Sequence, residues 1–244
     1  MLPKIMPLTK KVHLPIADKE VKVSAFKIAE EKLLLLHKSA TEEELENILF
    51  EIIKDKTTGV EVETLTMTDL TVLLINIIDL SRGMKREFTY KCNKKNEEGQ
   101  PCGTLIELEV NALDYKLTKE IQKNRLIKVD NTLACEVEYP SYGMMKELLK
   151  YKDNVGEYLI RFYSKLIKAV YHNDDVYTDF TEDEIYEWTL ELPHKTLKAF
   201  EDFIESIPDV IVEYDVACPK CGTSDHYIVS NILDFFIFDT QAMI

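Results

Sequence analysis

The chain has 244 residues and a formal net charge of −14 at pH 7, with 45% hydrophobic and 30% charged residues. This composition is typical of a folded protein rather than a disordered one, and the negative charge disfavours a nucleic-acid partner. The five cysteines are not preceded by a recognisable export signal, so we expect a cytoplasmic protein whose thiols bind metal or stay buried, rather than form disulfides.

The N-terminal residues show two patterns, a high proline content followed by an alternation of polar and apolar side chains. Residues 1–18 contain Pro3, Pro7 and Pro15, which disfavour a regular helix, so an extended arm or strand lead-in is expected there. The following residues alternate polar and apolar side chains at period two, which predicts a half-buried strand near Glu20–Phe26.

Three helices are then predicted, the first over residues 29–39 from its helical composition. Thr41 with Glu44 has the pattern of a capping box, which indicates that a helix begins there. The stretch from Leu70 to Leu80 is apolar on nearly all sides and is followed by Gly83, a residue that favours helix termination. This stretch is about half as long as a bilayer requires, so we expect a buried core helix and no membrane segment.

Two hairpins with cysteines at their turns are predicted next, at residues 85–110 and 209–236. Cys92 and Cys102 lie at the ends of the first loop, and Cys218 and Cys221 lie in a tight Cys-x-x-Cys turn of the second hairpin. Four thiolates can bind Zn²⁺ as a closed tetrahedron, and the glycine after each second cysteine permits a tight backbone turn. These residues therefore predict a structural, zinc-ribbon-like site; unmetallated thiols are the alternative.

A strand and the start of a helix are predicted over residues 131–151, and the segment between the hairpins is predicted to be a helical insertion at residues 140–208. An amphipathic pattern extends over residues 156–172, Thr181 with Glu184 forms a second capping box, and a further helix is expected over residues 194–207. The last predicted feature is the strongly apolar stretch at residues 232–238. Together these elements predict one α+β domain over residues 1–244, in which helical N-terminal and central segments surround a small antiparallel β unit.

The sequence contains no recognisable catalytic set, and we expect the protein not to be an enzyme. Its histidines lack the spacing of a helical metal motif, and we find no phosphate loop, dinucleotide fingerprint or nucleophile elbow. No catalytic or cofactor-binding residue is therefore predicted. His226 is a minor alternative as a metal ligand, Cys135 is expected to be a buried structural thiol, and a redox role for Cys218 and Cys221 is disfavoured.

The order of several sequence segments resembles one known family. The segments "PIADKEVKVSAFKIAEEKLLL", "VETLTMTDLTVLLINIIDLSRG", "FTYKC", "EYPSYGMMKELL" and "LKAFEDFIESIPDVIVEYDVACPKCG", with a later "FF", are similar to the baseplate hub protein family of T-even-type contractile-tail phages. The resemblance extends from about Leu14 to Phe236. Members of that family are described as baseplate hub subunits or hub assembly chaperones.

The resemblance implies a viral, non-enzymatic protein that binds other phage baseplate hub and tail proteins. It implies a location in the host-cell cytoplasm during assembly, and leaves open whether the protein remains in the tail baseplate of the virion. The alternative is a zinc-ribbon adaptor or a transcription-related, nucleic-acid-associated factor. The acidic residues around Cys218 and Cys221 disfavour that alternative, because a ribbon that binds nucleic acid needs basic and aromatic side chains.

Overall fold

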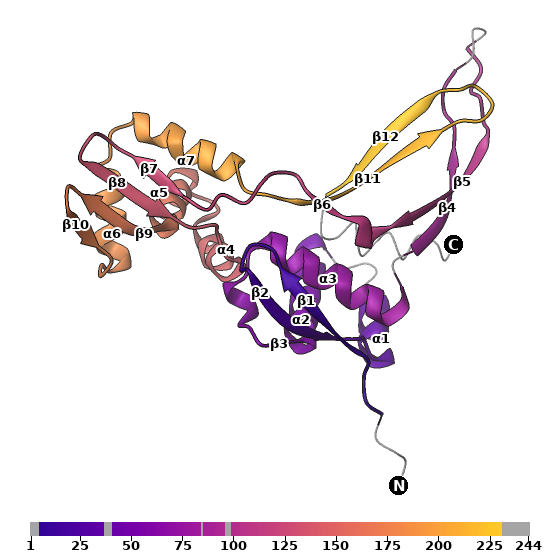
Figure 1. Ribbon diagram of the computed structural model, residues 1–244, viewed down its shortest axis with the longest axis horizontal. Coiled ribbons are helices and arrows are strands. Elements are labelled where there is room, and N and C mark those ends of the chain that lie inside the picture. The colour runs from indigo at the N-terminus through magenta and orange to yellow at the C-terminus, as the bar shows by residue number, and fades with distance from the viewer. Residues whose placement is uncertain (1–4, 37–40, 84, 96–98, 231–244) are drawn as a thin grey trace. The chain divides into compact units, whose positions relative to one another are not determined.

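The computed structural model describes residues 5–36, 41–83, 85–95 and 99–230 (Figure 1). The chain divides into two compact units. Unit 1 comprises Met1–Val60, Thr68–Thr118 and Asp209–Ile244, and unit 2 comprises Glu61–Met67 and Lys119–Pro208. The sequence predicts a single domain in which residues 140–208 are an insertion. In the structure the central segment forms a compact unit of its own, and this segment begins at Lys119 rather than at residue 140.

Unit 1 begins with a β-hairpin. β1 (Thr9–Leu14) pairs antiparallel with β2 (Lys19–Ser24), and β2 also pairs with the short β3 (Thr57–Thr58). Within the predicted extended arm or strand lead-in of residues 1–18, residues 9–14 form the strand β1, and residues 1–4 lie outside the described residues. The strand forms because Val12 and Leu14 alternate with polar residues and are buried, while Pro15 follows the strand's last residue.

Three helices complete this part of unit 1: α1 (Ile28–Leu36), α2 (Glu42–Lys56) and α3 (Met67–Arg82). The predicted capping box is present at α2, where the Glu44 amide donates to the Thr41 hydroxyl and the Thr41 amide donates to the Glu44 carboxylate. The predicted core helix is α3, which is buried from Thr68 to Ile78. Gly83 follows it with a φ of +77°, a left-handed conformation that glycine adopts without strain.

A buried carboxylate joins the N-terminal hairpin to α3. Asp69 is 1% exposed and accepts hydrogen bonds from the backbone amides of Ile16, at 2.9 Å, and Ala17, at 3.0 Å. These amides belong to the turn between β1 and β2, so the first turn of the core helix fixes the position of that turn. A buried carboxylate is stable in such a place because hydrogen bonds replace the water that it loses.

The rest of unit 1 contains the two predicted hairpins. β4 (Lys85–Lys91) pairs antiparallel with β5 (Leu105–Asn111), and β11 (Val210–Ala217) pairs antiparallel with β12 (Ser224–Val229) and with β6 (Lys116–Leu117). A single 3₁₀ turn, η2 (Ala112–Asp114), connects β5 to β6. Residues 231–236 of the second predicted hairpin and the apolar stretch at 232–238 lie outside the described residues.

Unit 2 contains a four-stranded antiparallel sheet, of which the sequence predicts a single strand, in the segment 131–151. Its order is β10-β9-β8-β7, with β7 (Leu126–Lys128), β8 (Leu133–Val137), β9 (Ile167–His172) and β10 (Asp175–Tyr177). The other elements are α4 (Tyr142–Leu148), α5 (Val155–Leu166), α6 (Glu182–Leu190), α7 (Lys195–Glu205) and the 3₁₀ turns η1 (Val62–Thr64) and η3 (Leu149–Tyr151).

The predicted amphipathic helix over residues 156–172 is therefore wrong beyond Leu166. There the chain becomes β9, in which Ile167, Ala169 and Val170 are buried. The strand is favoured because its residues pair with β8, as Cys135 does with Val170, and β-branched side chains fit a pleated sheet.

Aromatic side chains pack the interior of unit 2. The rings of Tyr139 and Phe203 stack with their centroids 5.4 Å apart, and those of Tyr163 and Phe200 lie 5.1 Å apart. The second predicted capping box is present, since Glu184 and Thr181 exchange hydrogen bonds at the start of α6. Of the helices in the described residues, none is both long and apolar enough to cross a membrane.

Candidate metal centre

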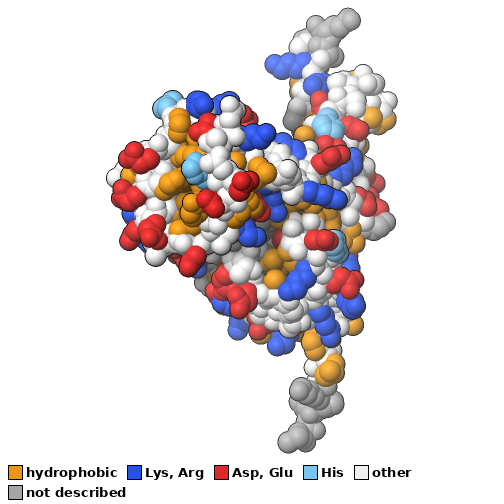
Figure 2. All heavy atoms as spheres, turned by 60° about the vertical axis from the view of Figure 1, so that its left-hand side comes forward, with side chains coloured by type: hydrophobic (Ala, Val, Ile, Leu, Met, Phe, Trp, Pro, Cys, Tyr) orange, Lys and Arg blue, Asp and Glu red, His pale blue; other side chains and the backbone are white. Residues whose placement is uncertain are grey.

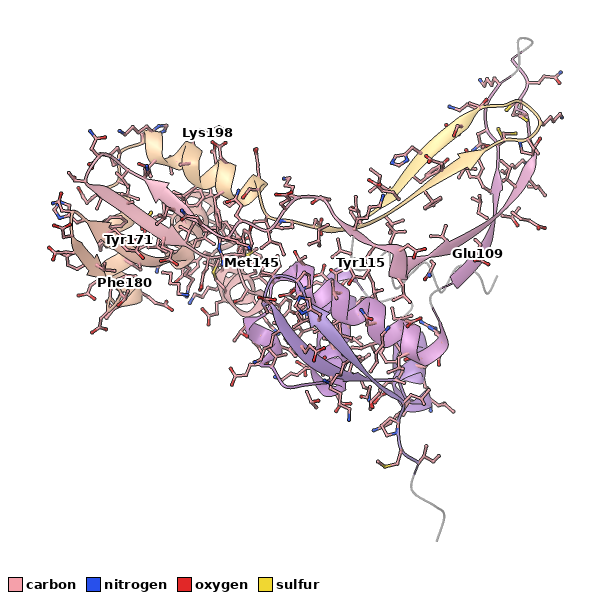
Figure 3. The ribbon with its side chains drawn as sticks, viewed as in Figure 1. Glu109, Tyr115, Met145, Tyr171, Phe180 and Lys198 are labelled. Carbon is pink, nitrogen blue, oxygen red and sulfur yellow. The ribbon has the colours of Figure 1, made fainter. Side chains whose placement is uncertain are left out.

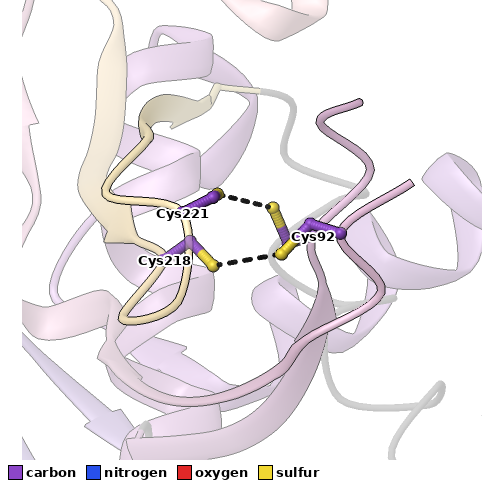
Figure 4. Close-up of side chains that lie close together, drawn as sticks. Cys92, Cys218 and Cys221 are labelled. Carbon is purple, nitrogen blue, oxygen red and sulfur yellow. Dashed lines mark hydrogen bonds between the residues drawn. The ribbon is translucent and has the colours of Figure 1, made fainter. Parts of the chain in front are cut away.

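Four cysteines from the two hairpins of unit 1 meet in space, as the sequence predicts for a metal site. Cys92 directly follows β4, Cys102 lies in the loop before β5, Cys218 directly follows β11, and Cys221 lies in the turn before β12. Their four Sγ atoms all lie within 4.8 Å of one another. Figure 4 shows the two closest pairs across the hairpins, with Cys92 Sγ 3.7 Å from Cys221 Sγ and Cys102 Sγ 3.8 Å from Cys218 Sγ.

These sulfur distances match those of a four-thiolate zinc site. With Zn–S bonds of about 2.3 Å in a tetrahedron, neighbouring sulfurs lie about 3.8 Å apart. A disulfide needs about 2.05 Å, so neither close pair is bonded, and all five cysteines are free thiols. The donor set thus fits a tetrahedral, thiophilic metal ion such as Zn²⁺.

The two hairpins use the same tripeptide, Cys-Gly-Thr, at residues 102–104 and 221–223. The glycine has a left-handed φ of +67° at Gly103 and +69° at Gly222, and a side chain is strained in that conformation. In each hairpin the turn allows the glycine amide to donate a hydrogen bond to the backbone carbonyl of the first cysteine. Gly103 N–H donates to Cys92 O at 3.0 Å, and Gly222 N–H donates to Cys218 O at 2.9 Å.

The threonine of each tripeptide contacts the sulfur of its cysteine. Thr104 Oγ1 lies 3.2 Å from Cys102 Sγ, and Thr223 Oγ1 lies 3.1 Å from Cys221 Sγ. Hydroxyl donors of this kind orient and stabilise thiolate ligands. The two glycines can be recognised from the sequence, but Thr104 and Thr223 were not predicted; the repeated tripeptide is the signal that could have revealed them.

The hydrogen bonds prepare two of the cysteines for ionisation. The hydroxyl and the amide of Thr223, followed by Cys218, lower the pKa of Cys221 from its usual value of 9.0 to about 6. The hydroxyl and amide of Thr104 likewise lower the pKa of Cys102. Cys221 is therefore disposed to be a thiolate, the form that binds metal, near neutral pH, and the pKa of Cys102 is shifted in the same direction.

Cys92 behaves in the opposite way. The Lys94 amide lowers its pKa, but burial and the three neighbouring cysteines outweigh that hydrogen bond and raise the pKa to about 12. Four sulfurs at this spacing repel one another when all are ionised, so the last proton is retained. A divalent cation at their centre would remove that repulsion and favour the fully deprotonated set.

Away from the sulfurs, aromatic and charged side chains join the hairpins. The rings of Tyr90 and Tyr227 meet edge to face with centroids 5.6 Å apart, and the Tyr90 hydroxyl donates to the Asp225 carboxylate at 3.2 Å. Lys94 forms an ion pair with Asp225 at 3.0 Å. These contacts carry little apolar burial, since β12 alternates between exposed and half-buried side chains. The cysteine cluster is therefore the main candidate for holding the hairpins together.

The remaining sequence candidates lie outside the cluster. His226, the minor alternative ligand, is exposed, and its Nδ1 lies 2.9 Å from Asp215 Oδ1, across from it on β11. Cys135 is fully buried in unit 2, where burial raises its pKa to about 12. That environment disfavours the thiolate form and agrees with the prediction of a buried structural thiol.

The arrangement limits the chemistry that the cluster can perform. A metal ion held by four thiolates has no open coordination position for water or substrate, so it cannot act as a Lewis acid on a bound substrate. Two ligands come from residues 92 and 102 and two from residues 218 and 221, so the ion would join distant parts of the chain. The geometry therefore suits stabilisation of the fold.

The comparison with family models identifies the chain's relatives. The model of the T4 bacteriophage base plate protein family matches residues 6–237, a span that includes all four clustered cysteines. Searches of curated proteins and of solved structures gave no match. Because the family model covers most of the chain, the protein belongs to the T4 bacteriophage base plate protein family.

Proposed function

We propose that the protein acts in assembly of the central hub of the phage tail baseplate, as a structural subunit or as an assembly chaperone. The observation that carries this proposal is the family match over residues 6–237, which supports a role in the baseplate and partners among other phage baseplate proteins. The hub is the more specific part of the proposal and rests on the sequence resemblance described above.

The proposed role is non-enzymatic and depends on protein–protein binding. The best-defined cluster of reactive side chains in the described residues is the four-cysteine group. A closed thiolate set of this kind supports a scaffold better than it supports catalysis. We propose that it binds one structural Zn²⁺ ion, which keeps the two hairpins of unit 1 in place while the protein binds its partners in the host-cell cytoplasm.

The proposal is tested by isolating the tagged chain from infected cells during tail assembly. We expect other baseplate and hub proteins to be recovered with it, and the Cys218→Ser variant to recover less of them. Recovery of nucleic acid or transcription proteins alone would contradict the proposal. Mass spectrometry of purified virions separates the two roles, because a subunit is present in the mature particle and a chaperone is absent from it.

A further inference from the structure

Unit 2 has an open, mainly apolar pocket beside α6. We call it the α6 pocket. It has a volume of about 520 Å³ and is lined by residues of β8, β9 and β10, of the loop after β10, and of α6. Its apolar lining residues are Leu133, Val170, Tyr177, Phe180, Ile185 and Trp188. Figure 3 shows Phe180 at the end of unit 2 where β10 and α6 lie.

The apolar lining of the α6 pocket extends onto exposed surface. Tyr177, which lines the pocket, is 51% exposed, and Val176 beside it is 55% exposed. Both belong to β10, one of the two edge strands of the sheet. A site that encloses a small molecule buries most of its ligand, whereas an apolar rim left open to solvent suits a segment of another protein.

The segment that forms this side of the pocket is strongly acidic. Residues 172–191 contain no Lys or Arg, and their acidic side chains are all exposed: Asp174, Asp175, Asp179, Glu182, Asp183, Glu184, Glu187 and Glu191. Two of these have partners already, since Glu182 pairs with Lys165 and Glu184 caps α6. Figure 2 shows hydrophobic side chains gathered on this unit, with Asp and Glu side chains around them.

The negative charge around the α6 pocket determines which kind of protein segment can bind there. An acidic rim repels acidic segments and attracts basic ones, and complementary charge around an apolar centre sets the specificity of an interface. A bulky apolar side chain that fills the pocket would supply the binding energy, as buried anchor residues do in other interfaces.

We propose that the α6 pocket receives a segment of another phage protein in which a bulky apolar side chain is flanked by Lys or Arg. This inference rests on the proposed function for the origin of the partner, and deepens it by giving the chemistry of the segment. Asp175 and Asp179 attract the basic residues, while Tyr177, Phe180 and Trp188 contact the apolar one.

Photo-cross-linking in infected cells tests the inference. Benzoylphenylalanine replaces Tyr177, which has a similar ring and faces the pocket, and mass spectrometry identifies the cross-linked segment. We expect one segment from another phage protein, with at least two Lys or Arg residues around an aromatic or large aliphatic residue. A neutral or acidic segment, or the basic N-terminal residues of a second copy of this chain, would overturn the proposal.

Charge reversal provides the matched control. The double variant D175K/D179K should reduce the cross-linked product at least tenfold, while D153K/E201K, which reverses two exposed carboxylates of unit 2 outside the pocket lining, should leave it unchanged. Equal loss in both variants, or no loss in either, would show that the acidic rim does not select the partner.

A synthetic peptide of the cross-linked segment then gives an affinity. Trp188 lines the pocket and is the chain's single tryptophan, so its fluorescence reports binding there. We expect saturable binding, weakened at least tenfold when the peptide's apolar residue is replaced by Ser. Equal binding by the Ser peptide would contradict the apolar anchor. If wild-type protein recovers baseplate proteins and D175K/D179K recovers them equally well, the pocket proposal fails while the proposed function stands.

Discussion

At the scale of single residues, the four cysteines supply the sulfur atoms of the candidate metal centre, and Thr104 and Thr223 each contact one of them. The cysteines can be predicted from the sequence because a metal site imposes a strict set of residue types. Cys218 and Cys221 have the spacing of a tight turn, and Cys92 and Cys102 stand at the ends of a predicted loop with a glycine following. Thr104 and Thr223 were missed because a threonine beside a glycine is common in any loop. Only their contacts with the sulfurs distinguish them, and these depend on the folded turn.

Replacing one ligand tests the metal centre directly. Elemental analysis of the purified protein should find about one zinc ion per chain, and Cys218→Ser should contain none, because three thiolates and a hydroxyl bind Zn²⁺ far less tightly than four thiolates. The variant should also lose the protease resistance of the hairpins at residues 85–111 and 210–229. Cys135→Ala is the matched control and should retain its zinc, since that thiol lies in unit 2. A stable wild-type protein without metal would disprove the structural role.

At the scale of secondary-structure elements, sequence patterns located helix starts better than helix ends. Thr41 and Thr181 form the capping boxes that the sequence predicts, because a cap depends on residues only three positions apart. The end of α5 depends on a distant partner. Ile167 and Val170 continue the apolar periodicity of the helix, and they are also buried as residues of β9. Periodicity alone therefore cannot decide whether these residues form helix or strand. Pairing with β8 decides it.

The second capping box gives a quantitative prediction. Thr181→Ala removes the side-chain acceptor for the Glu184 amide and should lower the free energy of unfolding of unit 2 by about 1 kcal/mol. Urea denaturation followed by the fluorescence of Trp188, which lies on α6 itself, measures the change. Thr181→Ser keeps the hydroxyl and should remain within a few tenths of a kcal/mol of wild type. Equal stability of the Ala and wild-type proteins would show that the cap contributes nothing.

At the scale of the whole molecule, the chain leaves unit 1 for the long central segment after Thr118 and returns to it at Asp209, and these two residues are hydrogen-bonded to each other. Thr118 N–H donates to Asp209 O at 2.9 Å, Asp209 N–H donates to the Thr118 hydroxyl at 2.9 Å, and Leu117 pairs with Val210 beside them. The sequence indicated an insertion but could not indicate a unit with its own sheet. In that sheet β8 lies where the sequence predicts a strand, whereas β7 has no recognisable pattern and the residues of β9 continue the apolar periodicity of a helix.

Removing the central segment tests whether unit 1 is independent. Because residues 118 and 209 are hydrogen-bonded to each other, a short Gly-Ser linker can replace residues 119–208. We expect the shortened chain to bind about one zinc ion, since all four ligands lie in unit 1. The same deletion with Cys218→Ser is the control and should bind none. Absence of zinc from the shortened chain with intact cysteines would mean that unit 2 is needed to form the site.

The distance along the chain between the two cysteine pairs has a consequence for synthesis. Cys102 and Cys218 are 116 residues apart, and at a translation rate of about 5–20 residues per second the ribosome needs roughly 6–23 s to cover that interval. During this time the first pair can offer an ion only two thiolates, while the whole of residues 119–208 emerges and can fold. The complete set of four thiolates can therefore form only in chains that have been translated beyond Cys221, and binding of the proposed Zn²⁺ ion would be one of the last steps in the maturation of unit 1.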